Sequence, residues 1–152
     1  MQELYSQKTA VFKNASSATA NATTTVDITA SGSQTLFLVK QADGSYGISA
    51  YANDNTSTSG KARVRFINVS SLLSSSINVT TSTGTSILSA LSFKAASAYQ
   101  TIDANTSLNV NATGSLETTT ISGSEFQAGK VYTVWFDSAT STKVKYHVIA
   151  QN

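Results

Sequence analysis

The clearest alternation of hydrophobic and polar positions in the chain lies in Lys61–Ser70, which reads KARVRFINVS. Arg63 and Arg65 alternate with apolar residues that include Phe66, and this two-residue period predicts a strand with one face in water and one face buried. After Phe66 the apolar residues change phase, because Ile67 falls on the side of the arginines. A β-bulge or a crossing between two sheets would produce that change, so we expect one of them at this point.

The rest of the chain breaks into short apolar or β-branched runs separated by glycines and small polar residues. The runs at 34–40 and 131–136 are apolar on both phases, which is typical of central strands covered on both faces. Asp43-Gly44 is a strong signal for a hairpin turn between two of the runs. The expected strands are 9–13, 23–29, 34–40, 45–51, 61–70, 77–80, 87–93, 131–136 and 143–149, with shorter runs around Ile102, Leu108, Val110 and Ile121.

No window sustains the 3.6-residue period of a helix. The best helical candidate is SILSALSFKAASA at 86–98, and the pattern does not favour a helix there. Many short strands with turns about every 8–12 residues predict an all-β chain, folded as an antiparallel immunoglobulin-like or transthyretin-like β-sandwich. We expect its core to include Phe66, Val134, Trp135, Phe136 and Tyr146.

A polar run at 53–60 that ends in glycine has the composition of a linker. It divides the chain into a short β unit at 1–58 and a β-sandwich domain at 59–152. A chain of 152 residues is long enough for one ordinary domain or for two small ones. The first unit is therefore expected to be a smaller β structure that precedes the main domain.

Two internal matches indicate that the first unit is a shortened copy of the second. A shift of 54 residues places Phe12 on Phe66, and a shift of 98 residues places TLFL at 35–38 on TVWF at 133–136. The copy would keep the opening strand and the closing hairpin and lack about forty residues between them. The alternative explanation is the general similarity of β-strand sequences.

Residues 61–152 resemble the DUF4397 family of bacterial and archaeal surface domains. The resemblance rests on KARVRFINVSS at 61–71, ILSALSFKAASAYQTIDA at 87–104 and FQAGKVYTVWF at 126–136. The family typically opens with a strand similar to ARVRFVNAS and closes with one similar to EAGKAYTV; where it usually has a turn with Pro and Asp, this chain has SLLSSSINV. The resemblance implies a β-sandwich, often in tandem, that is exported and anchored, and it implies no catalytic residues.

Composition narrows the class of protein. The chain has no Cys and no Pro, only 12% charged residues and a formal net charge of +2, which excludes disulfides and gives no basic face for nucleic acid. Ser, Thr, Asn, Ala and Gly dominate, as is common in secreted and cell-surface proteins. No apolar run reaches the roughly 18 residues that a membrane span needs. The N-terminus lacks the features of a signal peptide, so we expect any export signal or anchor to lie outside this sequence.

Candidate chemistry is sparse. His147 is the only histidine, and its phase places it on the polar face of the last strand beside two lysines. One histidine without cysteine excludes the usual zinc and Cys/His sites. The eight acidic residues are scattered and form no DxDxDG calcium loop. We therefore predict no catalytic residues, no metal, no cofactor and no enzyme activity.

Aromatic residues leave one binding function open, a carbohydrate-binding module, because aromatic faces stack on sugar rings. Tyr46 and Tyr51 flank the second strand of a predicted hairpin and are the candidate ligand-binding residues, whereas Trp135 is expected in the core. Seven asparagines begin N-x-S/T triplets, and several such triplets arise by chance in a chain rich in Ser and Thr. They are Asn14, Asn21, Asn55, Asn68, Asn78, Asn105 and Asn111.

The leading hypothesis is a non-catalytic structural or interaction module at the cell surface, with protein partners, copies of itself or a surface glycan as ligands. A shortened sandwich unit would leave strand edges without neighbours. Either the first unit packs on the second within one chain, or a strand from a neighbouring subunit completes it. Met1–Lys13 is the natural donor strand, and head-to-tail donation would build an extracellular filament.

Overall fold

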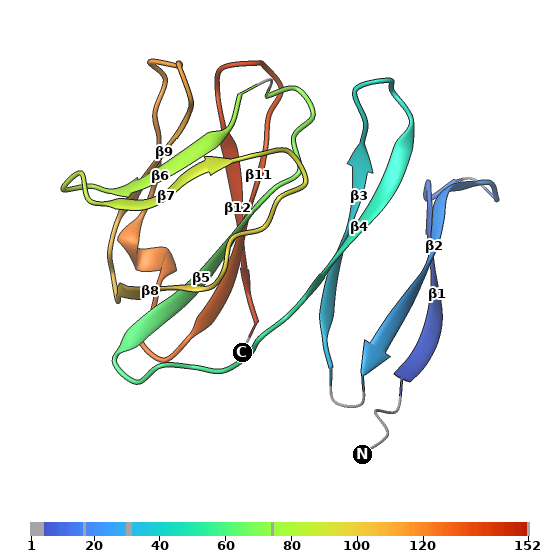
Figure 1. Cartoon of the computed structure of the whole chain (residues 1–152), viewed down its shortest axis with the longest axis horizontal. Helices are drawn as coiled ribbons and strands as arrows, with labels where there is room; N and C mark the ends of the chain where they lie inside the picture. The colour runs from blue at the N-terminus through green and yellow to red at the C-terminus, as the bar shows by residue number, and fades with distance from the viewer. Residues whose placement is uncertain (1–4, 17, 30–31, 74, 152) are drawn as a thin grey trace. The chain divides into compact units, whose positions relative to one another are not determined.

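The computed structural model describes residues 5–16, 18–29, 32–73 and 75–151, and these ranges contain twelve strands and no α-helix (Figure 1). The chain divides into two compact units, residues 1–54 and 55–152. This boundary lies four residues before the one that the linker composition indicates.

The first unit holds four strands and the second holds eight strands and one short 3₁₀ turn. The strands are β1 (Tyr5–Lys13), β2 (Ala20–Thr29), β3 (Gln34–Lys40), β4 (Tyr46–Ala52), β5 (Lys61–Asn68), β6 (Ile77–Thr81), β7 (Ser86–Leu91), β8 (Gln100–Asp103), β9 (Leu108–Ala112), β10 (Thr119–Ile121), β11 (Val131–Asp137) and β12 (Lys145–Ala150), with the 3₁₀ turn η1 at Gly123–Glu125.

The second unit is the predicted β-sandwich. One sheet has the strand order β10-β9-β6-β7 and the other has the order β12-β11-β5-β8. The sheets are antiparallel except at one place, where β5 and β11 run parallel with Phe66 beside Val134. The first strand of the sandwich thus lies beside the strand that opens the closing hairpin, about 65 residues later in the chain.

The core of the second unit lies between the two sheets. Phe66 on β5 and Phe136 on β11 are fully buried, and their rings stack with centroids 6.0 Å apart and planes at 4°. Val134 is also fully buried, which confirms three of the five expected core residues. Tyr146 is half-buried at the margin of the core.

The prediction for Trp135 was wrong. Its neighbours Val134 and Phe136 point into the core, so strand alternation turns the indole to the other face of the sheet, where it is half-buried. The irregularity expected near Ile67 does not lie in the pairing of β5 with β11; on the other side of β5 the pairing shifts by one residue, from Val64 opposite Gln100 to Ile67 opposite Ala96. β5 stays in unbroken register with β11 from Arg63 to Asn68, and Ile67 shares the face of the arginines and is fully buried there.

Arg65 is buried rather than wet, with 4% of its surface exposed. Its Nη2 donates to Thr133 Oγ1 at 3.0 Å, and its guanidinium lies 5.1 Å from the centre of the Tyr99 ring. The long aliphatic stem of an arginine packs along a sheet while its head keeps polar and aromatic partners, so alternation alone did not reveal this burial.

The helical candidate at 86–98 forms no helix, as the pattern indicated. Residues 86–91 form the edge strand β7, which pairs with β6 through shifts in register. Ala90 and Lys94 both have positive φ, 58° and 63°, which a regular helix does not allow, and Ala90 lies where the register of β7 shifts.

The first unit consists of two separate hairpins, β1–β2 and β3–β4, with β2 close to β4. Among its described apolar residues only Val26 and Val39 are buried, whereas the core cluster of the second unit contains seventeen residues. An isolated two-stranded hairpin is marginal in water, because it cannot bury an apolar face by itself. The first unit is therefore poorly stabilised by its own packing.

Candidate functional site

The hairpin β3–β4 has the same pairing register as the closing hairpin β11–β12. Thr35 faces Tyr51 and Leu38 faces Ile48 in the first unit, and the residues 98 positions later, Thr133 with Ile149 and Phe136 with Tyr146, face each other in the second. The shift that aligned the two sequences thus also aligns all six residue pairs of β11–β12 with six of the seven pairs of β3–β4. This agreement supports the internal repeat, because an unrelated pair of hairpins has no reason to share one register.

The two hairpins differ in what lies beside them. β11 has β12 on one side and β5 on the other, whereas β3 has β4 as its one neighbour among the described strands. The side of β3 that corresponds to the β5-binding side of β11 therefore has no strand pairing with it. We call this side the open β3 edge, and it is the main candidate site.

The second unit protects its own sheet edges. β10 and β8 are only three and four residues long, β7 is broken by its register shifts, and β12 carries Lys145 at its start. Short strands, irregular strands and lysines are the usual protection against strand addition.

The first unit has less of this protection, since Lys8 and Lys13 lie on β1 but β2 and β3 are nearly uncharged. β2 is ten residues long with Asp27 as its one charge, and β3 has its one charge at the terminal Lys40. Long, nearly uncharged strands with a free side are templates for pairing with another chain. The contrast places the strand-binding potential of the protein in its first unit.

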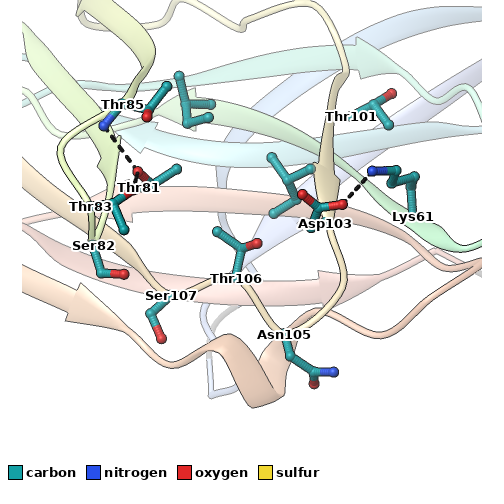
Figure 2. A pocket seen from close by; sticks show the side chains of 12 residues that line it. Lys61, Thr81, Ser82, Thr83, Thr85, Thr101, Asp103, Asn105, Thr106 and Ser107 are labelled. Atoms are coloured by element: carbon teal, nitrogen blue, oxygen red, sulfur yellow. Dashed lines mark hydrogen bonds and ion pairs between the residues drawn. The ribbon is translucent and has the colours of Figure 1, made fainter.

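A hollow in the second unit is a second candidate site, with a volume of about 560 Å³. Figure 2 shows hydroxyl side chains gathered around it from the β6–β7 turn and from the segment that follows β8. Lys61 and Asp103, directly opposite on β5 and β8, form an ion pair at its rim. The lining is Lys61, Thr81, Ser82, Thr83, Thr85, Ile87, Thr101, Ile102, Asp103, Asn105, Thr106 and Ser107.

Local hydrogen bonds fix the two walls of the hollow. In the β6–β7 turn, Thr81 Oγ1 accepts from the Thr85 N–H at 3.0 Å, and the Ser82 N–H donates to Ser107 O at 3.0 Å in the opposite wall. A Cβ on Gly123 would lie 2.0 Å from Asn105 O, so this glycine allows η1 to pack directly on the Asn105 turn.

The hollow offers hydrogen bonding rather than acid–base chemistry. Asp103 is the one carboxylate in its lining, and it is paired with Lys61, with 76% and 46% of the two side chains exposed. An ion pair so exposed contributes at most about 1 kcal/mol. Hydroxyls, one amide and two isoleucines suit a polar, uncharged ligand.

Two polar clusters lie on the outer face of the β12-β11-β5-β8 sheet. Arg63 and Arg65 lie about equally far from the Tyr99 ring, at 5.0 and 5.1 Å, and the Tyr99 hydroxyl donates to Gln151 Oε1 at 2.7 Å. His147 is exposed, as expected, and its Nε2 lies 3.3 Å from Asp137 Oδ1. Sequence reasoning missed both clusters, since their members come from different strands.

The structure separates the two tyrosines proposed as ligand-binding residues. Tyr46 is 48% exposed and Tyr51 is half-buried, and strand alternation places them on opposite faces of β4. The Tyr51 ring contacts Phe37 edge to face at 6.0 Å. The two tyrosines therefore form no shared stacking platform, and ligand binding by either one stays a prediction.

The described residues contain no group of three or more His, Cys, Asp or Glu side chains that could hold a metal ion. None of their helices is long and apolar enough to cross a membrane. Among known proteins, neither a family model nor a curated sequence matches the chain.

Proposed function

We propose that the protein is a non-catalytic structural subunit that assembles by β-strand addition, with the β1–β2 hairpin of one copy pairing with the open β3 edge of the next. The observation that carries this proposal is the shared register of β3–β4 and β11–β12. Two hairpins of the chain share one register, and among the described strands a further strand pairs with the second hairpin but not with the first.

The internal repeat supplies a register for the proposed pairing. In the second unit Phe66 on β5 lies beside Val134 on β11. Phe12 corresponds to Phe66 and Leu36 to Val134, so Phe12 of one copy would lie beside Leu36 of the next. The two strands would run parallel, as β5 and β11 do.

β1 is free to make this pairing without leaving its hairpin. It pairs with β2 along one side only, in the antiparallel manner in which β5 pairs with β8. The sheet formed across two copies would have the order β2-β1-β3-β4, which repeats the order β8-β5-β11-β12 of the second unit. The proposed interface thus copies an arrangement that this chain already uses.

Apolar burial would drive the assembly. Phe12 on β1 and Leu36 and Leu38 on β3, which would share one face of the joined sheet, are only half-buried. Full burial of such a side chain contributes about 1.5–3 kcal/mol. Because β1 and β3 are different surfaces of one chain, the contact is head to tail and builds a filament unless its rotation closes a ring.

A location at the cell surface fits this proposal. Its support is the Ser-, Thr- and Asn-rich composition with 12% charged residues and the resemblance of residues 61–152 to the DUF4397 family. In that setting the second unit would be the folded body of each subunit and the first unit its connector.

Disulfide trapping tests the proposal, because the chain contains no native Cys. The double variant Phe12→Cys/Leu36→Cys should give a ladder of covalent multimers under oxidising conditions, and reduction should return it to one band. The matched control is Val11→Cys/Leu36→Cys. The side chain of residue 11 would lie on the opposite face of the sheet from residue 36, so this pair should stay monomeric.

Two results would overturn the assembly. One is a disulfide between positions 12 and 36 within a single chain, which would show that the unit completes itself. The other is a chain that stays monomeric in sedimentation at every concentration tested and forms no disulfide at all.

The hollow in Figure 2 supports a second candidate function, binding of a neutral carbohydrate through its hydroxyl-rich walls. A glycan array is the test, with Asp103→Ala expected to lose any hit and Glu117→Gln, an exposed change outside the hollow, expected to keep it. An array without a hit at high protein concentration would remove this function and leave the assembly proposal untouched.

A further inference from the structure

N-x-S/T triplets are more frequent in this chain than its composition explains. Ser and Thr make up 47 of the 152 residues, so about three of the nine asparagines with a residue two positions later would begin such a triplet by chance. Seven of the nine do so. The excess indicates that the hydroxyl residues are placed relative to asparagine.

The fold leaves some of these asparagine side chains exposed and buries others. Asn14 directly follows β1, Asn55 lies in the segment between β4 and β5, and Asn105 lies in the turn after β8; all three are exposed. Asn105 has a φ of 61°, and Figure 2 shows its amide directed away from the β6–β7 turn. Exposed turns suit glycan attachment, because a bulky sugar there displaces no packed neighbour.

In other triplets the asparagine side chain is hydrogen-bonded to neighbouring parts of the fold. Asn68 is fully buried, with its Nδ2 donating to Leu91 O at 3.2 Å and its Oδ1 accepting from the Ser70 N–H at 3.0 Å. Asn78 on β6 donates to Thr113 Oγ1 and accepts from the Ala90 N–H. A sugar on either Nδ2 would replace one of its two N–H groups and crowd these bonded neighbours.

Asn14 and Asn68 form an internal comparison, since the shift of 54 residues aligns them and both begin a triplet. Asn68 is covered by the segment at 91–95, whose Lys94 N–H and Ala95 O bond its backbone. The shorter first unit has no counterpart of this segment. The asparagine at this repeat position is thus exposed in the first unit and buried in the second.

We propose that Asn14, Asn55 and Asn105 are sites of N-linked glycosylation and that Asn68 is not. The co-reactant is an oligosaccharide linked to a polyprenyl phosphate or diphosphate, brought by a transferase of the producing cell. The amide Nδ2 loses one proton to a base and forms a bond to C1 of the first sugar. The bond between C1 and the phosphate oxygen breaks, and the lipid phosphate leaves; no oxidation or reduction occurs.

Glycans at these positions would add polar bulk to a surface that has few charges. With 12% charged residues and a net charge of +2, charge contributes little to the solubility of the chain. In the proposed strand pairing Asn14 would lie beside Leu38 of the next copy, so we expect a glycan on Asn14 only in copies whose β1 is unpaired. Asn14 lies in the first unit, and Asn55 and Asn105 lie in the second.

Mass spectrometry of the protein isolated from the organism that makes it tests the proposal. Peptides that contain Asn14, Asn55 and Asn105 should each exceed the mass of the bare peptide by a whole glycan. Ser16→Ala and Ser57→Ala, expressed in the same host, should each remove one glycan. Ser59→Ala, an exposed change outside any triplet, should remove none.

Two results would overturn it. Peptides from the producing organism that contain Asn14, Asn55 and Asn105 and carry no added mass would show that these triplets are not used. A glycan on Asn68 of the folded protein would show that access in this fold does not select the sites. All three serine variants change exposed side chains, so we expect them to fold. A glycan missing from Ser16→Ala or Ser57→Ala can therefore be attributed to the lost triplet.

Discussion

Trp135 and His147 stack face to face across the β11–β12 pair, with ring centroids 3.9 Å apart and planes at 14°. They are direct partners in the antiparallel register, so the backbone pairing itself brings the rings together. Cross-strand aromatic pairs contribute roughly 0.2–1 kcal/mol beyond an alanine pair. The stack therefore holds the outer edge strand of the sandwich onto its neighbour.

His147→Ala should lower the free energy of unfolding by about 0.5–1 kcal/mol, because the stack on Trp135 is lost. Trp135 is the single tryptophan, so its fluorescence should shift to longer wavelength as the indole gains water. Asp137→Asn is the control, since it removes the charge near His147 and keeps the stack. An unchanged emission maximum in the alanine variant would contradict this account.

Phe136→Ala should cost about 3–5 kcal/mol of stability, because it empties a fully buried site that stacks on Phe66. Denaturant unfolding measures the change. Leu116→Ala, at a fully exposed position, should change stability by less than about 0.5 kcal/mol. Equal effects from the two variants would mean that the sheets do not meet at Phe136.

Asn68→Ala should destabilise the second unit by about 1–3 kcal/mol for each buried partner left without a hydrogen bond, at Leu91 O and the Ser70 N–H. Asn109→Ala is the comparison, because Asn109 is half-buried on an outer face and accepts from Thr120 Oγ1. We expect a loss there of under about 1 kcal/mol. An Asn68→Ala variant of unchanged stability would show that neither hydrogen bond stabilises the second unit.

Gly123→Ala should be more destabilising than Gly44→Ala. At Gly123 a Cβ would lie 2.0 Å from Asn105 O, and the backbone on both sides of that contact would have to move. At Gly44 the surrounding space is empty and only the φ of +86° opposes alanine, at a cost of about 1 kcal/mol. Thermal unfolding of the two variants checks the order.

Residues 55–152 expressed alone should unfold cooperatively, because every member of the core cluster lies within that unit. Hydrogen exchange in the full monomeric chain should be slow in β5, β6, β9 and β11 and fast in β1–β4, where few side chains are buried. Slow exchange throughout β1–β4 of the monomer would mean that the first unit is stable without an added strand.

The sequence by itself determined the class of fold. Alternation at 61–66 and 143–149 and two-phase apolar runs at 34–40 and 131–136 predicted strands that the structure contains. Side-chain alternation is a local property of an extended backbone, so it is visible in a single strand. The repeat that aligned the two closing hairpins was also visible before their shared register was known.

Tertiary structure decided what each strand faces. Arg65 is buried because Tyr99 and Thr133, far away in sequence, come to lie against it, and Trp135 faces outward because Val134 and Phe136 fill the core. The hollow likewise combines a turn near 83 with one near 105. Which strands become neighbours depends on how the whole set of sheets buries its apolar faces, and no single stretch of sequence carries that information.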